Sequence, residues 1–214
     1  LIIHIAAELP EVSATYGDNF KPMHQRVPDV PMYFQYAWGA DRSSHIRASG
    51  VLRNPYMYKV SKDSNTSLLG WGVQFSGTIK VCKPLRLFMN GVYGKGITPY
   101  IQDLTGSGLD FTPNPADPTL VRMMPMWGVQ AAGQINFTPR LFVSGGYSTV
   151  RVQRSEGYYT ADQYKQGQYI FGNIFYSLTP RCKVAAEYLY GSRKDMSNDK
   201  GHANRVNVML QYSF

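Results

Sequence analysis

Basic side chains recur in segments of the chain where polar and apolar residues alternate. Each stands at a polar position, so in an extended strand all of them would lie on the face opposite the apolar residues. The guanidinium group of arginine is planar, and its paired N–H donors match the two oxygens of a carboxylate. Several Arg and Lys side chains arranged around a water-filled passage select for anions. The predicted anion-binding, pore-lining set is Arg47, Arg53, Lys80, Arg86, Arg193 and Arg205, with Glu187 as the one clear acid. We expect Glu187 to pair with one arginine, and any single cation could instead only hold the fold through an ion pair.

No residue pattern in the chain is typical of a hydrolase or of a metal centre. GxSxG, HExxH and CxxC motifs are absent, and the histidines have no partner at a recognisable spacing. The four histidines are His4, His24, His45 and His202. We therefore predict no enzyme activity, no catalytic residue, no metal and no cofactor. One enzymatic alternative stays open, a ten-stranded outer-membrane protease with an acid-base set drawn from Asp18, Asp162, Asp195 and His202.

The composition is typical of a protein that lies at a boundary between apolar and aqueous surroundings. The chain has 16 Tyr, 10 Phe, 3 Trp and 20 Gly, while charged residues make up 17%. Tyrosine combines an apolar ring with a polar tip, which suits membrane-water boundaries. The net charge of +8 does not predict nucleic-acid binding, because the basic residues are dispersed and no zinc pattern or recognition helix is evident. No run of eighteen apolar residues predicts a transmembrane helix.

The last segment, 202–214, alternates strictly from Val206 onward and ends with Tyr212 and Phe214 on its apolar side. Nine further segments show related alternation, although the faces of 164–178 are ambiguous. The predicted strands are 1–16 with a bulge or kink at Pro10, then 30–38, 45–55, 69–81, 85–96, 123–137, 141–153, 164–178, 183–193 and 202–214. These lengths fit tilted membrane-spanning strands.

The connections between these strands alternate in length. Short ones fall at 39–44, 82–84, 138–140 and 179–182, and long ones at 17–29, 56–67, 97–121, 155–163 and 194–202. Short turns on one side and long loops on the other are the rule for outer-membrane barrels. We predict an all-β fold, a transmembrane antiparallel up-and-down β-barrel in which residues 1–214 form a single domain. The loop at 97–121 is long enough to suggest a function.

Two further expectations concern the cysteines and the beginning of the chain. Cys82 and Cys182 each stand beside a predicted tight turn, and we interpret them as small turn-edge residues rather than a disulfide pair. The sequence opens at Leu1 without a Met or a signal-peptide pattern, which indicates a mature chain or a fragment.

Several stretches together resemble the DcaP-like outer-membrane porins, especially those of Bacteroidota-type bacteria. They are LGWGVQFSG at 69–77, NGVYGKGITPYIQDL at 90–104, MWGVQ at 126–130, EYLYGSRKDM at 187–196 and GHANRVNVMLQYSF at 201–214. The resemblance implies a C-terminal portion of a longer chain, about ten strands of a sixteen-stranded barrel that forms a homotrimer. It also implies passive uptake of small anionic solutes such as dicarboxylates, with Arg47, Arg53 and Arg205 best placed at a constriction.

The function predicted from these features is an outer-membrane porin of a Gram-negative bacterium, surrounded by lipid and lipopolysaccharide and selective for small anions. An alternative is a non-conducting structural or adhesion barrel whose long loops bind a partner or fold inward as a plug. The width of the barrel matters for this choice, because ten closed strands enclose little more than side chains whereas sixteen leave an aqueous channel.

Overall fold

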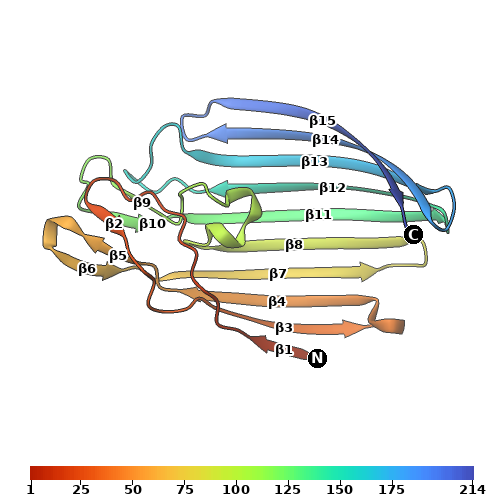
Figure 1. Cartoon of the computed structure of the whole chain (residues 1–214), viewed down its shortest axis with the longest axis horizontal. Coiled ribbons are helices and arrows are strands. Elements are labelled where there is room, and N and C mark those ends of the chain that lie inside the picture. The colour runs from red at the N-terminus through yellow and green to blue at the C-terminus, as the bar shows by residue number, and fades with distance from the viewer.

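The computed structural model of the protein describes all 214 residues and consists mainly of one antiparallel sheet of ten strands. Each strand is hydrogen-bonded to the next one of the sheet along the chain, as in an up-and-down barrel (Figure 1). In order they are β1 (Ile2–Ile5), β3 (Val30–Trp38), β4 (Ser44–Arg53), β7 (Gly70–Lys80), β8 (Leu85–Lys95), β11 (Pro125–Thr138), β12 (Leu141–Val152), β13 (Tyr164–Ser177), β14 (Cys182–Asp195) and β15 (Lys200–Tyr212).

The short and long connections lie at opposite ends of the sheet (Figure 1). The four short ones, at 39–43, 81–84, 139–140 and 178–181, lie where the sequence predicts them. At the long-loop end, the last connection is shorter than predicted, because β14 and β15 are joined by only four residues, 196–199. There Asn198 takes a positive φ of 79°, which lets a tight turn replace the predicted loop at 194–202.

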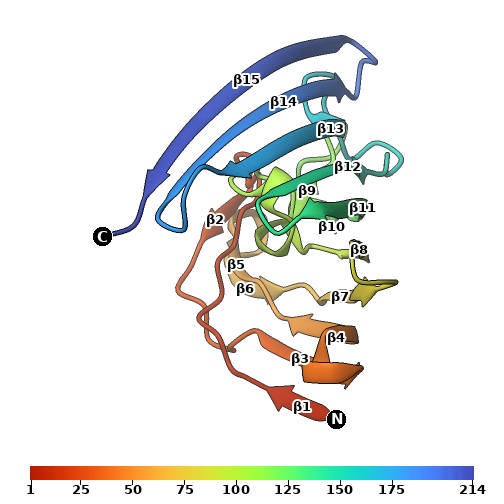
Figure 2. The ribbon, with the colours of Figure 1, turned by 90° about the vertical axis from the view of Figure 1, so that its right-hand side faces the viewer.

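Figure 2 shows that the sheet bends into a trough and that β1 and β15, its outermost strands, lie apart. Apolar residues occupy the convex face, where Val206, Val208 and Leu210 are 71%, 83% and 73% exposed. Apolar side chains this exposed fit the lipid-facing surface of a membrane barrel. The concave face carries the polar residues of each strand, which fits a water-filled interior.

No helix in the structure is both long enough and apolar enough to cross a membrane.

Smaller elements fold at the long-loop end. Residues 96–124 connect β8 to β11, and we call them the inward loop because they lie on the concave side of the sheet (Figure 2). It contains the 3-10 turns η3 (Thr98–Tyr100) and η4 (Gln102–Leu104) and the hairpin strands β9 (Phe111–Pro113) and β10 (Val121–Met123). The remaining elements are β2 (Phe20–Pro22), β5 (Tyr56–Lys59) and β6 (Ser64–Ser67), which form a three-stranded sheet, and the 3-10 turns η1 (Ala40–Arg42) and η2 (Val60–Lys62).

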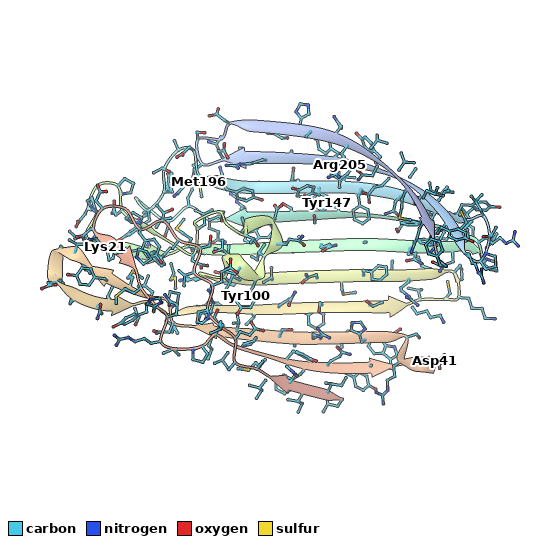
Figure 3. The ribbon with its side chains drawn as sticks, in the orientation of Figure 1. Lys21, Asp41, Tyr100, Tyr147, Met196 and Arg205 are labelled. Carbon is cyan, nitrogen blue, oxygen red and sulfur yellow. The ribbon has the colours of Figure 1, made fainter.

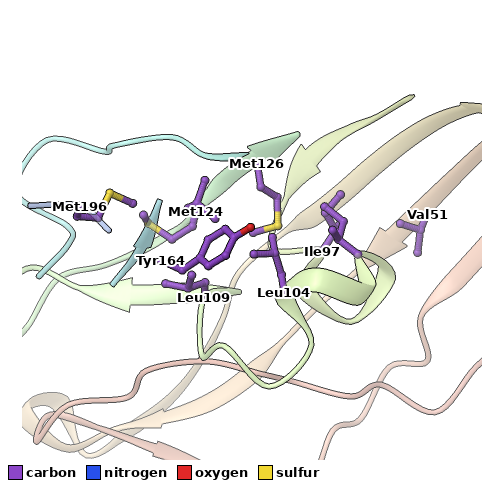
Figure 4. Close-up of a cluster of buried hydrophobic side chains, with 10 residues drawn as sticks. Val51, Ile97, Leu104, Leu109, Met124, Met126, Tyr164 and Met196 are labelled. Carbon is purple, nitrogen blue, oxygen red and sulfur yellow. The ribbon is translucent and has the colours of Figure 1, made fainter. Parts of the chain in front are cut away.

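The hydrophobic core lies in the trough, between the inward loop and the sheet. Leu104 and Leu109 of the loop are fully buried against Met126 and Val152 of the sheet. Figure 4 shows Tyr164 of β13 between the side chains of this cluster. A second cluster joins Phe20, Met57, Phe111 and Met123. The inward loop is thus packed against the sheet through buried apolar side chains.

The first predicted strand is much shorter than expected. Only Ile2–Ile5 pairs with β3, and isolated bridges at Glu8 and Ala14 follow it. Pro10 has no N–H to give to a ladder, and Val12, Ala14 and Tyr16 pack against the second cluster instead. The prediction of a strand over 1–16 was therefore wrong beyond residue 5, because packing on the loops draws the chain off the sheet.

Gly94 of β8 is packed closely against the backbone of β7 and against the beginning of the inward loop. A Cβ at this position would meet the carbonyl oxygen of Trp71, the Cα of Gly72 at 2.7 Å and the Cδ1 of Ile97 at 2.8 Å. We expect Gly94→Ala to lower the free energy of unfolding by about 1 to 3 kcal/mol, because the added methyl group overpacks this site. The measurement is the urea midpoint at which the heat-modifiable folded band is lost in electrophoresis.

Gly172→Ala is the matched control, because no atom lies within 4 Å of the added Cβ there. Equal midpoints for the two variants would show that the close approach at Gly94 does not constrain the fold.

Candidate functional site

The pairing register places all seven residues of the predicted site on the concave face. One row runs through Gln35, Arg47, Ser76, Asn90, Gln130, Ser148 and Tyr169, each directly opposite the next. Arg47 stands in the middle of β4 and donates from Nε and Nη2 to Oε1 of Gln35, at 2.9 and 2.6 Å. Its guanidinium lies over the ring of Tyr33, 4.3 Å from the centroid. These contacts hold the group in place without neutralising its charge.

Lys80 and Arg86 lie directly opposite each other on β7 and β8, next to the short turn at 81–84. Like charges that face each other across two strands repel, and neither forms an ion pair with a carboxylate. The pair is therefore a local concentration of positive charge on the concave wall.

Glu187 does not pair with an arginine, contrary to the prediction. Its Oε1 accepts a hydrogen bond of 2.9 Å from Asn207, and its Oε2 accepts one of 3.4 Å from Asn173. The Nε of Arg205 donates to Oδ1 of Asn207 at 2.7 Å. One asparagine thus stands between the acid and the cation, and the reason is the register, which sets Asn207 and not Arg205 opposite Glu187.

Arg193 and Arg205 line one side of a cleft of about 1030 Å³ between the last strands and the inward loop. Arg193 forms an exposed ion pair of 2.8 Å with Asp195, of the kind that contributes little stability. Arg205 is exposed and has no acidic partner. Figure 3 shows Arg205 among the last strands and Tyr100 in front of β7 and β8.

Arg53 shares the face of Arg47, but it lies under the inward loop and has an exposed fraction of 1%. Its Nε donates to Asp29 at 2.8 Å and its Nη1 to Asp110 at 3.1 Å. The guanidinium also donates to the carbonyl oxygens of Gly96 and Glu11. Arg53 is therefore a structural tether between the wall, the N-terminal segment and the inward loop, and it does not face open space.

Asp110 is the point at which the inward loop is held. Its carboxylate accepts hydrogen bonds from Arg53, from the backbone N–H of Ser13 at 3.0 Å, and from the backbone N–H and hydroxyl of Thr98. Tyr100 adds a hydroxyl that donates to Glu8 at 3.1 Å. Burial and the charges of Asp29 and Glu8 raise the pKa of this hydroxyl far above its ordinary value, so it remains a donor.

Sequence patterns did not reveal Asp29, Asp110 or Tyr100. They stand in predicted loops, where an acidic or aromatic residue has no periodic neighbours to give it a face. The only signal was the length of the connection at 97–121, which indicated a function without indicating that the loop folds inward.

The four residues of the protease alternative do not form an acid-base set. His202 stacks on Tyr190, whose position in the register is on the convex face. Asp162 accepts a hydrogen bond from Thr160, and Asp195 pairs with Arg193. Asp18 forms no side-chain hydrogen bond with these residues. Since His202 has no carboxylate partner, the structure supplies no support for general-base chemistry here.

The cysteines and the other candidate ligands remain separate. Cys82 and Cys182 are free thiols. No group of three His, Cys, Asp or Glu side chains is placed to hold a metal ion.

Two solved structures resemble this fold, whereas no protein-family model and no curated protein sequence matches the chain. The outer-membrane channel DcaP of Acinetobacter baumannii has a TM-score of 0.80 at 19% identity, over 99% of this chain and 58% of that one. The NanC porin has a TM-score of 0.50 at 12% identity, over 87% of this chain and 80% of that one. The chain thus spans less than two thirds of the length of DcaP. These likenesses establish the fold, which is that of an antiparallel porin-type β-barrel.

Proposed function

We propose that the chain is part of an outer-membrane porin of a Gram-negative bacterium that lets small anionic solutes such as dicarboxylates diffuse through a water-filled channel. The observation that carries this proposal is the set of concave-face cations without a carboxylate partner. Among the residues predicted from the sequence they are Arg47, Lys80, Arg86 and Arg205. Unpaired cations on a wetted wall concentrate anions and repel cations.

The apolar convex face supports the location of the protein in a bilayer. Its surroundings would be lipid and, in the outer leaflet, lipopolysaccharide, with no nucleic acid involved. The open sheet between β1 and β15 supports the view that further strands complete the barrel, as expected for the C-terminal portion of a DcaP-like, Bacteroidota-type chain. Assembly as a homotrimer belongs to the same proposal.

The selectivity of the channel should reverse when concave-face cations become acids. The measurement is the reversal potential in a planar bilayer under a KCl gradient. We expect its sign to indicate anion selectivity for the native protein and cation selectivity for the double variant Arg47→Glu with Arg86→Glu. Arg181→Glu, in the short turn at 178–181, is the control and should leave the sign unchanged. Cation selectivity or absence of conductance in the native protein would overturn the proposal.

The inward loop favours one other function, that of a non-conducting barrel with a filled lumen. Its buried cluster shows that the loop occupies part of the trough. Releasing the inward loop from the sheet, as by Arg53→Met, distinguishes the two functions. Conductance should rise if the loop narrows an open channel, and it should stay at zero if other side chains fill the lumen.

A further inference from the structure

Glu187 and Arg205 lie at two ends of one hydrogen-bonded network on the concave wall of β13, β14 and β15. Asn207 accepts from Arg205 at 2.7 Å and donates to Glu187 at 2.9 Å. A direct ion pair would neutralise both charges, whereas here one amide keeps them apart and oriented. The guanidinium keeps both of its terminal nitrogens free, since the network uses only Nε.

Apolar side chains frame this pair of charges. The register sets Phe171 beside Leu189 and Leu189 beside Arg205 in one row, and Phe175, Ala185 and Met209 in the row on the other side of Glu187. All of these side chains are half-buried or exposed. Phe175 also stacks on Phe142, with centroids 4.6 Å apart. The wall therefore offers an anion, a cation and an aromatic surface within one small area.

We propose that this area is a binding subsite for zwitterionic α-amino acids with an apolar side chain, resting on the channel function proposed above. The ammonium group is hydrogen-bonded by the carboxylate of Glu187, and the solute carboxylate by the terminal nitrogens of Arg205. The apolar side chain packs on Phe171 and Phe175. A dicarboxylate fits less well, because its second carboxylate would face Glu187.

The test compares two blockers of KCl current through the native protein that differ only in the amino group, L-phenylalanine and 3-phenylpropanoate. We expect Glu187→Gln to weaken block by phenylalanine about tenfold, the loss expected for one charge-assisted hydrogen bond, and not to weaken block by 3-phenylpropanoate. Arg205→Gln should weaken block by both. Glu156→Gln, an exposed acid in the connection at 153–163, is the matched control and should change neither.

Equal weakening of both blockers in Glu187→Gln would overturn the subsite, and so would a conducting native channel that phenylalanine does not block. A native protein without any conductance would instead count against the channel function. Heat-modifiable migration of each variant in electrophoresis shows that it is folded, and Glu187→Asp, which keeps the charge, should retain part of the preference for phenylalanine.

Discussion

Replacement of Arg53 by methionine is expected to detach the inward loop from the sheet and to raise the single-channel conductance. The substitution leaves Asp29 and Asp110 buried, with exposed fractions of 2% and 0%, and without their cation. One oxygen of Asp29, Oδ1, already has no hydrogen-bond partner. Breaking a buried ion pair from one side costs about 3 to 5 kcal/mol. The loop is the element that can give way, because the strand ladders do not depend on Arg53.

Limited proteolysis and conductance measure this release. Cleavage within 96–124 should appear in Arg53→Met and not in Arg181→Met, a control at an exposed turn position. Adding Asp29→Asn and Asp110→Asn to Arg53→Met should restore part of the protection, since no uncompensated charge then stays buried. Native-like protection and conductance in Arg53→Met alone would show that the ion pairs do not hold the loop.

Replacement of Leu104 by alanine is expected to loosen the same loop through its apolar contacts. Leu104 ends η4, is fully buried, and belongs to the cluster with Met126 and Val152. Truncation of a buried leucine to alanine costs about 2 to 5 kcal/mol through lost burial and the cavity left behind. We expect faster proteolysis of the loop and more frequent fluctuations of the open-channel current.

Leu120→Ala is the matched control, because Leu120 lies in the same loop and is 44% exposed. Similar proteolysis rates in the two variants would mean that the cluster does not fix the loop. In a variant with both Leu104→Ala and Arg53→Met, the increase in loop proteolysis should be smaller than the sum of the increases in the two single variants. The reason is that both substitutions act on one packed element.

The amino-acid sequence by itself determined nine of the ten strands of the large sheet, their order and, outside β13, their faces. In β15 the alternation of Val206 and Val208 with Arg205 and Asn207 is enough to assign the two faces of the strand. The reason is that successive side chains of a strand point to opposite faces. For the same reason, the sequence was enough to predict that Arg47 and Glu187 lie on the face opposite the apolar residues. The ambiguous strand β13 shows where this reasoning ends. With Tyr169 and Phe175 on one face and Ile174 on the other, only pairing with Ser148 of β12 decides which face is concave.

Only the tertiary structure decided what each inner residue contacts. Arg47 and Arg53 have the same parity, yet Arg47 faces the trough while Arg53 is buried by Asp29 and Asp110, which are 24 and 57 positions away in the sequence. Glu187 likewise meets Asn207, 20 positions away, and not an arginine. Strand periodicity is local and is therefore visible in the sequence. Contacts between the loop and the wall depend on how a 29-residue connection closes on the sheet, and no local pattern records that path.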